Sequence, residues 1–239
     1  MLRFLSPAWF ALFVFDILFA VAFGVFFKGK DEEKARRIML GIAIFNAFYW
    51  VLYKFMISLD VEYVFIFFEE LPLHLCNINT ILLIVALSKK NQTLMSFCFC
   101  FGTLGALLAI MTPDPFFVEV HLFSSRGAGY WIYHHLLLAQ CIALVTSGLY
   151  KPQYSHLKKT VPLLFGIYLA MYPVNLLIRA ITGANANYLY TFGMEGNPLT
   201  GMLYKLIPVY PLFMIPAVIP LSIIALFMLW LARLGSREA

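Results

Sequence analysis

The sequence predicts an all-α fold, a polytopic transmembrane helical bundle, from three observations. Apolar residues make up 62% of the 239 residues, well above the roughly 45–50% usual in soluble domains. Only 12% of the residues are charged, and these charges gather in short clusters between long apolar runs. No segment has the alternating pattern of a transmembrane barrel strand. Backbone groups in hydrocarbon need partners within their own segment, so the apolar runs are expected to be helices.

Seven apolar runs are long enough to be candidate spans, because a bilayer core about 30 Å thick takes about 20 helical residues. The third run is the shortest, and the first is expected to be a retained helix rather than a cleaved signal peptide. We expect a single transmembrane domain over residues 1–239. The predicted spans cover residues 9–27, 38–57, 71–87, 94–111, 129–150, 161–181 and 210–231.

The positions of the basic residues predict the orientation. Most of the 17 lysines and arginines fall in loops on one side of the predicted bundle, and basic residues in short loops stay cytoplasmic. The N-terminus is therefore expected outside and the C-terminus in the cytoplasm. The net charge of +5 is then explained by attraction to an anionic inner leaflet, and we expect the membrane rather than a nucleic acid as partner.

Polar side chains gather at the predicted outer ends of the spans. An ionisable residue at membrane depth is costly and is a functional candidate by default. His74 and His134 lie at nearly the same predicted depth, and with Cys76 they are the predicted catalytic residues. We interpret the whole set as one pocket that opens to the extracytoplasmic side. Its predicted substrate-binding residues are Asn77, Thr80, Asp114, Asn175, Arg179, Asn187 and Tyr188.

Other charged and polar positions have simpler interpretations. Histidines on transmembrane helices can also join helices by hydrogen bonds, at about 1 kcal/mol per pair. Asp16 in the first span needs a partner or a proton. Arg179 is the candidate cation, with the membrane interface or a lipid phosphate as its alternative positions. His135 points about 100° away from His134 and is expected to face lipid headgroups or a neighbouring helix.

The sequence favours neither a metal nor another cofactor. A metal at the two histidines would need a third ligand, such as Asp114 or Glu70. No zinc-binding spacing of histidines or cysteines occurs in the chain. We therefore expect the site to work without a metal.

Four strings carry a family resemblance. LPLHLCNIN, GALLAIMTPD, IYHHLLL and NANYLY occur in this order along the predicted spans and their outer loops. In order and spacing they resemble the YwaF-like bacterial integral membrane family, distant relatives of eukaryotic transmembrane protein 164. The resemblance covers the chain from about Leu71 to Pro198. It implies a multi-pass protein of the bacterial cytoplasmic membrane.

The resemblance also implies an activity. The eukaryotic relative is described as an acyltransferase that moves polyunsaturated acyl groups onto ether phospholipids, with a fold similar to androgen-induced membrane hydrolases of fatty-acid esters. Carried over by residue, it makes His74 and His134 the polar pair, and Asp114, Asn187 and Tyr188 further motif positions. The sequence departs from the pattern at one place. The nucleophilic cysteine directly precedes the first histidine in the acyltransferase, and here that position is Leu73.

Three functions remain open at this point. The leading hypothesis is acyl transfer or ester hydrolysis on a membrane phospholipid at the outer leaflet, with His134 or His74 as general base and Cys76 or Thr80 as nucleophile. Asn77 would stabilise the oxyanion. The alternative is a carrier or binding protein for a small molecule or lipid. The third is a membrane scaffold whose histidines only connect helices.

Overall fold

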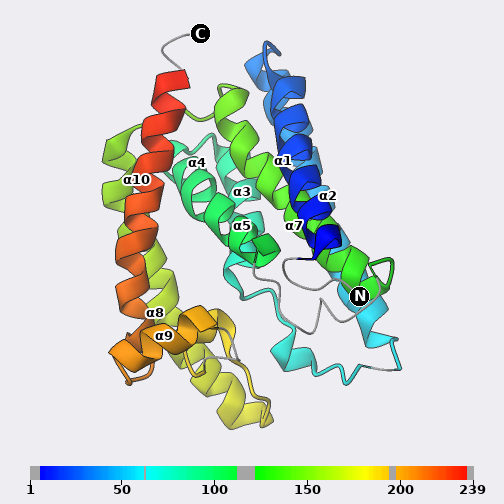
Figure 1. The fold of residues 1–239 in the computed structure, drawn as a ribbon, viewed down its shortest axis with the longest axis vertical. Coiled ribbons are helices and arrows are strands. Elements are labelled where there is room, and N and C mark those ends of the chain that lie inside the picture. Colours follow the sequence, from blue (N-terminus) through cyan, green and yellow to red (C-terminus); the bar gives the residue numbers. More distant parts are fainter. Residues whose placement is uncertain (1–5, 62, 112–121, 194–197, 236–239) are drawn as a thin grey trace. The chain divides into compact units, whose positions relative to one another are not determined.

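The structure is a computed structural model that describes residues 6–61, 63–111, 122–193 and 198–235, and within them it contains helices and no strand (Figure 1). This confirms the predicted all-α class. The chain forms two compact units. The first comprises Met1–Val64 and Cys76–Pro152, and the second comprises Phe65–Leu75 and Gln153–Ala239.

The first unit is built from long helices that begin at polar caps. The side chain of Asp31 accepts a hydrogen bond from the backbone N–H of Lys34 at 2.9 Å, and Ser124 does the same for Gly127 at 3.1 Å. Such caps satisfy amides that a helix start leaves unpaired. The helices are α1 (Pro7–Phe27), α2 (Glu32–Ser58), α3 (Leu75–Lys89), α4 (Gln92–Phe97), α5 (Thr103–Met111) and α7 (Ser125–Thr146).

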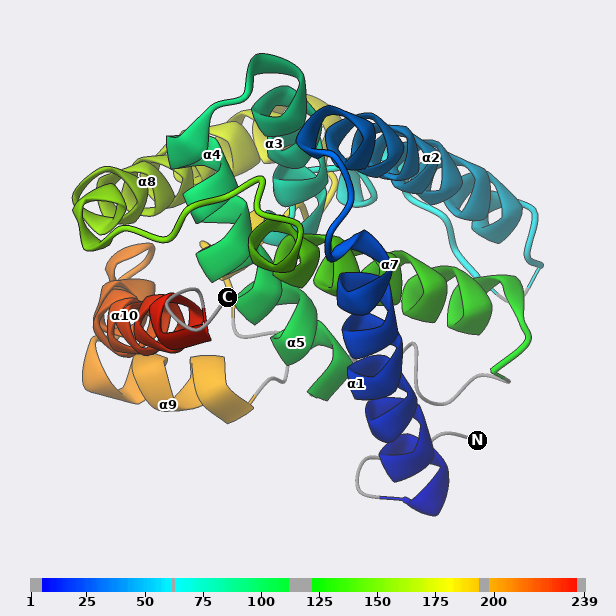
Figure 2. The same ribbon diagram turned by 90° about the horizontal axis from the view of Figure 1, so that it is seen from above.

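Helix α7 is the core of the first unit. It packs against α1, α2 and α5, which lie around it (Figure 2). Most of its side chains are buried. Gly129 lets α2 approach, because a Cβ at this position would lie 2.6 Å from the ring of Tyr53. Small residues at helix contacts are typical of membrane bundles, where close packing holds the helices together.

A π-helical segment, Cys98–Gly102, joins α4 to α5. Its last residue packs directly on α3, since a Cβ at Gly102 would lie 2.1 Å from Nδ2 of Asn79. The Cys98 thiol lies 3.8 Å from the backbone oxygen of Asn79. The segment therefore brings α3 close to the α4–α5 helix at a fully buried amide side chain.

The second unit contains two long helices and several short ones. Helices α8 and α10 pack together (Figure 1). Helix α8 ends at Gly183, whose φ of +71° is a left-handed conformation that glycine adopts without strain. The elements are η1 (Phe67–Glu69), η3 (Tyr154–His156), α8 (Leu157–Thr182), η4 (Tyr188–Tyr190), α9 (Pro198–Leu206), η5 (Leu212–Ala217) and α10 (Val218–Gly235).

Helix lengths agree with a multi-pass membrane protein. Among the described residues, six helical segments are long and apolar enough to cross a bilayer, and they match six of the predicted spans. The predicted third span, 71–87, corresponds to the shorter helix α3 of 15 residues. Residues 71–74 are not helical, so the expectation that His74 lies on this helix is wrong. The predicted orientation stays a prediction.

Candidate functional site

Helices α3 and α7 of the first unit are joined by a cluster of hydroxyl groups. The hydroxyls of Thr80 and Tyr133 lie 2.7 Å apart. Each is also 3.1 Å from the backbone oxygen of Cys76. The two hydroxyl hydrogens can make two of these three hydrogen bonds at a time, and in each combination the cluster joins α3 to α7. The arrangement fixes the start of α3, and with it the Cys76 thiol, against the middle of α7.

His134 lies on α7 beside this cluster. Its ring packs on the rings of Tyr130 and Tyr133, with centroids 4.3 and 5.1 Å away. Its Nδ1 lies 2.8 Å from the backbone oxygen of Tyr130. A carbonyl can only accept, so Nδ1 carries the proton and donates it. In the neutral ring Nε2 then has the lone pair, which is the state that a general base requires.

A second polar cluster lies in the second unit, around the end of α8. Asn175 is fully buried and its amide bonds to the loop that follows the helix. Its Nδ2 donates to the backbone oxygen of Tyr188 at 2.9 Å and to the hydroxyl of Thr191 at 2.7 Å. Its Oδ1 accepts from the Tyr188 N–H at 3.1 Å. One side chain therefore holds η4 on α8.

Tyr188 connects this loop to the segment that carries His74. Its hydroxyl accepts from the Leu71 N–H at 2.8 Å and donates to the Phe68 oxygen at 2.7 Å. The His74 ring lies against the rings of Tyr188 and Tyr190, with centroids 5.2 and 6.2 Å away. Burial raises the pKa of Tyr188 to about 12, and the hydrogen bond from Leu71 opposes that shift. The hydroxyl is thus a neutral structural link at physiological pH.

Arg179 and Asn187 complete the second cluster. The Arg179 Nε donates to the backbone oxygen of Ala186 at 2.7 Å, and its guanidinium lies 4.8 Å from the centroid of the Phe192 ring. Asn187 accepts from the Phe192 N–H at 2.7 Å and donates to the Gly193 oxygen at 3.2 Å. Both side chains hold the loop after α8 in one conformation.

The family follows from a match along almost the entire chain. The sequence model described as the TMEM164 family matches residues 4–231. The chain belongs to the TMEM164 family. No curated protein and no solved structure matches the chain.

The predicted site of this TMEM164-family chain is divided between the two units. The first unit holds Cys76, Asn77, Thr80 and His134, and the second holds His74, Asn175, Arg179, Asn187 and Tyr188. Within each unit these residues lie close together, as described above. The meeting of His74 with His134 stays a prediction. Asp114 lies outside the described residues.

Asp16 and Arg179 lie in different units, and each has a partner in its own unit. Arg179 binds the loop after α8, and Asp16 instead contacts His135 through Oδ1 and Nδ1. Asp16 is 2% exposed and His135 is 7% exposed, so His135 faces a neighbouring helix, which was one of its two expected environments. Depth along the helix is consistent with the pair, because each residue lies near the middle of its helix, α1 or α7, but the packing of α1 on α7 is also needed to identify it.

The described residues hold no group of three histidine, cysteine, aspartate or glutamate side chains that could bind a metal ion. Groups suited to acyl chemistry include the Cys76 thiol and the imidazole of His134. An imidazole with a fixed tautomer beside a helix that carries a thiol can perform nucleophilic acyl chemistry. The Thr80 hydroxyl is already bonded to Tyr133 and the Cys76 oxygen.

Proposed function

We propose that this protein transfers an acyl group from a membrane phospholipid, with the Cys76 thiol as nucleophile and His134 as general base. The observation that carries the proposal is the 2.8 Å distance between His134 Nδ1 and the Tyr130 oxygen, which in a neutral ring leaves Nε2 as the basic nitrogen. A second observation supports it, because both residues contact Tyr133. The Tyr133 hydroxyl lies 3.1 Å from the backbone oxygen of Cys76, and the Tyr133 ring packs against the His134 ring. The proposed site is therefore assembled within the first unit.

The reaction would run in two balanced steps. The His134 Nε2 takes the proton of the Cys76 thiol, and the sulfur attacks the ester carbonyl of the donor lipid. The bond between sulfur and acyl carbon forms, the ester C–O bond breaks, and the imidazolium returns its proton to the leaving alkoxide. An acceptor hydroxyl then attacks the thioester with His134 again as base and releases the thiol. Water as the acceptor would make the enzyme a lipid hydrolase.

Other predicted residues have supporting roles in this proposal. Asn77, one residue after Cys76 on α3, is the proposed oxyanion donor. Thr80 is a weaker candidate nucleophile than Cys76 because its hydroxyl is bonded to Tyr133. His74 is the alternative base. The tight loop around Tyr188 would hold His74 in place.

The proposed substrate and location extend the family membership. The six long apolar helices place the protein in a membrane, where a phospholipid reaches the site by diffusion in the bilayer plane. We propose the outer leaflet of the bacterial cytoplasmic membrane, in line with the resemblance to the YwaF-like proteins and the androgen-induced hydrolases. Neither a metal nor another cofactor takes part.

The test uses the purified full chain in lipid nanodiscs with acyl-labelled phospholipid and unlabelled lysophospholipid. Cys76→Ala and His134→Gln are each expected to lower the transfer rate by at least about 100-fold. Cys141→Ala is the matched control, since it removes a buried thiol from α7, and it is expected to retain activity. Label transfer at the wild-type rate in Cys76→Ala would rule out the thiol as nucleophile, and no transfer by the wild type would rule out the activity.

A carrier is the second candidate function, and one observation favours it. Asn46 on α2 and Gln140 on α7 are fully buried, and one side-chain oxygen of each has no hydrogen-bond partner among the described residues. Buried polar atoms of this kind can bind a polar solute or water. Uptake of labelled lysophospholipid into proteoliposomes that Gln140→Leu abolishes, while label transfer is absent, would establish the carrier.

A further inference from the structure

One face of α10 forms a continuous apolar groove in the second unit. Two adjoining cavities share Tyr154 and Trp230, and the larger, of about 390 Å³, is also lined by Ile223, Leu226 and Phe227. These α10 residues recur every three or four positions and so lie on one helix face. The rings of Phe227 and Trp230 stack with centroids 5.7 Å apart. The groove has an apolar floor along the helix.

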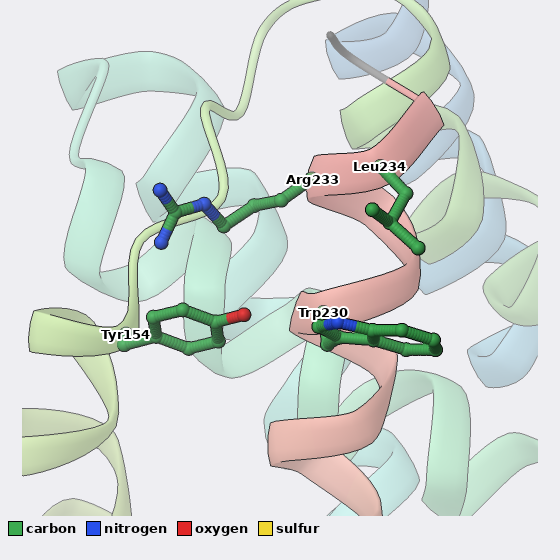
Figure 3. Close-up of a pocket in the computed structure, with 4 residues that line it drawn as sticks. All are labelled: Tyr154, Trp230, Arg233 and Leu234. Carbon is green, nitrogen blue, oxygen red and sulfur yellow. The ribbon is translucent and has the colours of Figure 1, made fainter.

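The groove ends at a cation. The smaller cavity, of about 250 Å³, is lined by Tyr154, Trp230, Arg233 and Leu234. Figure 3 shows the guanidinium of Arg233 above the Tyr154 ring, with the Trp230 indole opposite. The guanidinium carbon lies 4.6 Å from the centroid of the Tyr154 ring. Stacking on an aromatic ring orients the planar donor fork of arginine, which suits bidentate binding of phosphate.

Charge at this end of the groove favours an anion. The first turn of α8, close in sequence to Tyr154, contains Lys158 and Lys159 and no acidic residue. Basic residues at a helix N-terminus add to the positive end of the helix dipole, which by itself attracts anions. Arg233, Lys158 and Lys159 all lie on the predicted cytoplasmic side, where the leaflet is rich in anionic lipid.

We propose that this groove is a binding site for an anionic phospholipid of the inner leaflet, with one acyl chain along α10 and the phosphate at Arg233. The length fits. Ile223 to Arg233 spans about 15 Å of helix, roughly half of a hydrocarbon core about 30 Å thick and hence one leaflet. Trp230 and Tyr154 lie between the apolar floor and the cation, the usual level of aromatic residues at the membrane interface. The proposal does not depend on the acyl-transfer activity.

Native mass spectrometry of the purified full chain tests the site by titrating phosphatidylglycerol and phosphatidylcholine with identical acyl chains. The wild type is expected to bind phosphatidylglycerol about tenfold more tightly, as one charge-assisted interaction provides. Arg233→Gln should remove this preference and Arg233→Lys should keep part of it. Equal affinity of the wild type for both lipids, or an unchanged preference in Arg233→Gln, would overturn the site.

Three further measurements separate the groove from general surface charge and from a soluble ligand. Arg37→Gln removes an arginine whose side chain is 74% exposed on α2, and it is expected to keep the full preference. Trp230→Ala should weaken both lipids alike. Glycerol phosphate, which has no acyl chain, should not compete at the lipid concentrations used. A loss of preference in Arg37→Gln equal to that in Arg233→Gln, or competition by glycerol phosphate, would contradict the proposal.

Discussion

The two units differ in how completely their buried polar groups are paired. In the second unit, Asn175 and Tyr188 use both donor and acceptor atoms in bonds to the loop after α8 and to the segment before α3. In the first unit, both side-chain polar atoms of Asn79 and both carboxyl oxygens of Asp16 have no regular hydrogen bond among the described residues. The Asp16 carboxyl instead forms a close contact with the His135 ring through Oδ1 and Nδ1.

This difference separates structural polar groups from available ones. A buried polar group that is fully paired stabilises one conformation, whereas an unpaired one is costly and is kept where it can bind a ligand, a water or a proton. The second-unit cluster therefore holds the segment that carries His74 in one conformation, and we call this cluster of hydrogen bonds the lock. Most of the buried polar atoms that lack a hydrogen-bond partner among the described residues lie in the first unit, although the Thr160 hydroxyl on α8 is one in the second. The first unit is also where the proposed thiol and base lie.

Removing Asn175 should produce the largest change in stability. Asn175→Ala would leave the backbone N–H and oxygen of Tyr188 and the hydroxyl of Thr191 without their bonds. The free energy of unfolding should fall by roughly 3–5 kcal/mol, since each buried unpaired group costs about 1–3 kcal/mol. Unfolding by a denaturing detergent in bicelles measures this change. Asn185→Ala, at an exposed position, is the control and should be neutral; equal stability of the two variants would remove the proposed lock.

Breaking the Asp16–His135 contact should have the next largest effect. Asp16→Leu leaves a buried imidazole without its partner on α1 and should lower the unfolding free energy by about 3 kcal/mol. The double variant with His135→Leu should recover most of that loss, because no polar group then remains unpaired. Purely additive effects in this double-mutant cycle would show that the two residues do not interact.

The all-α class and most helix positions could be predicted because hydropathy marks apolar runs of the length that a bilayer requires. Six predicted spans match helices to within a few residues at most ends, since the bilayer sets both their composition and their length. The predicted start of the third span was wrong, because residues 71–74 are apolar enough to extend a helix but are not helical. The Leu71 N–H donates a hydrogen bond to the Tyr188 hydroxyl instead. Such a long-range bond leaves no trace in local sequence.

The site was predicted less completely because depth gives height along a helix but not direction around it. Asn175, Asn187 and Tyr188, which the sequence placed in one polar set, lie in and after the last turns of α8. Depth could not show that they bond to one another rather than to a substrate. Nor did it find the partner of Asp16, since the choice between Arg179 and His135 depends on which helices are neighbours, and packing of α1 on α7 decides that.

Tyr188→Phe tests the lock at a single oxygen. Loss of the bonds to Leu71 and Phe68 should lower the unfolding free energy by about 2 kcal/mol. The pKa of Tyr188 is raised to about 12 in the folded state, against about 10 in an unfolded chain. The stabilisation that comes from keeping the Tyr188 hydroxyl neutral is therefore complete below pH 10 and is lost as the pH rises towards 12. Between these values the wild type should lose more stability than Tyr188→Phe.

The matched control for this pH dependence is Tyr172→Phe, which keeps the ring stacked on Phe192 at 4.8 Å between centroids. In the Tyr172→Phe background, the Tyr188→Phe substitution should change the pH dependence of stability between pH 10 and 12 as it does in the wild type. Parallel curves for the wild type and Tyr188→Phe would show that the Tyr188 hydroxyl ionises as easily in the folded chain as in the unfolded one.

The smallest expected effect has the opposite sign and concerns Asn79. Its amide is fully buried against Gly102, with no hydrogen-bond partner for either side-chain polar atom among the described residues. Asn79→Leu replaces it with an apolar group of similar shape and should raise the unfolding free energy by about 1 kcal/mol, because an unpaired amide no longer has to be desolvated. If the unfolding free energy falls instead, the amide has a bound water or ligand as partner. The polar groups of the first unit would then be paired as those of the second are, but through a bound molecule instead of through protein atoms.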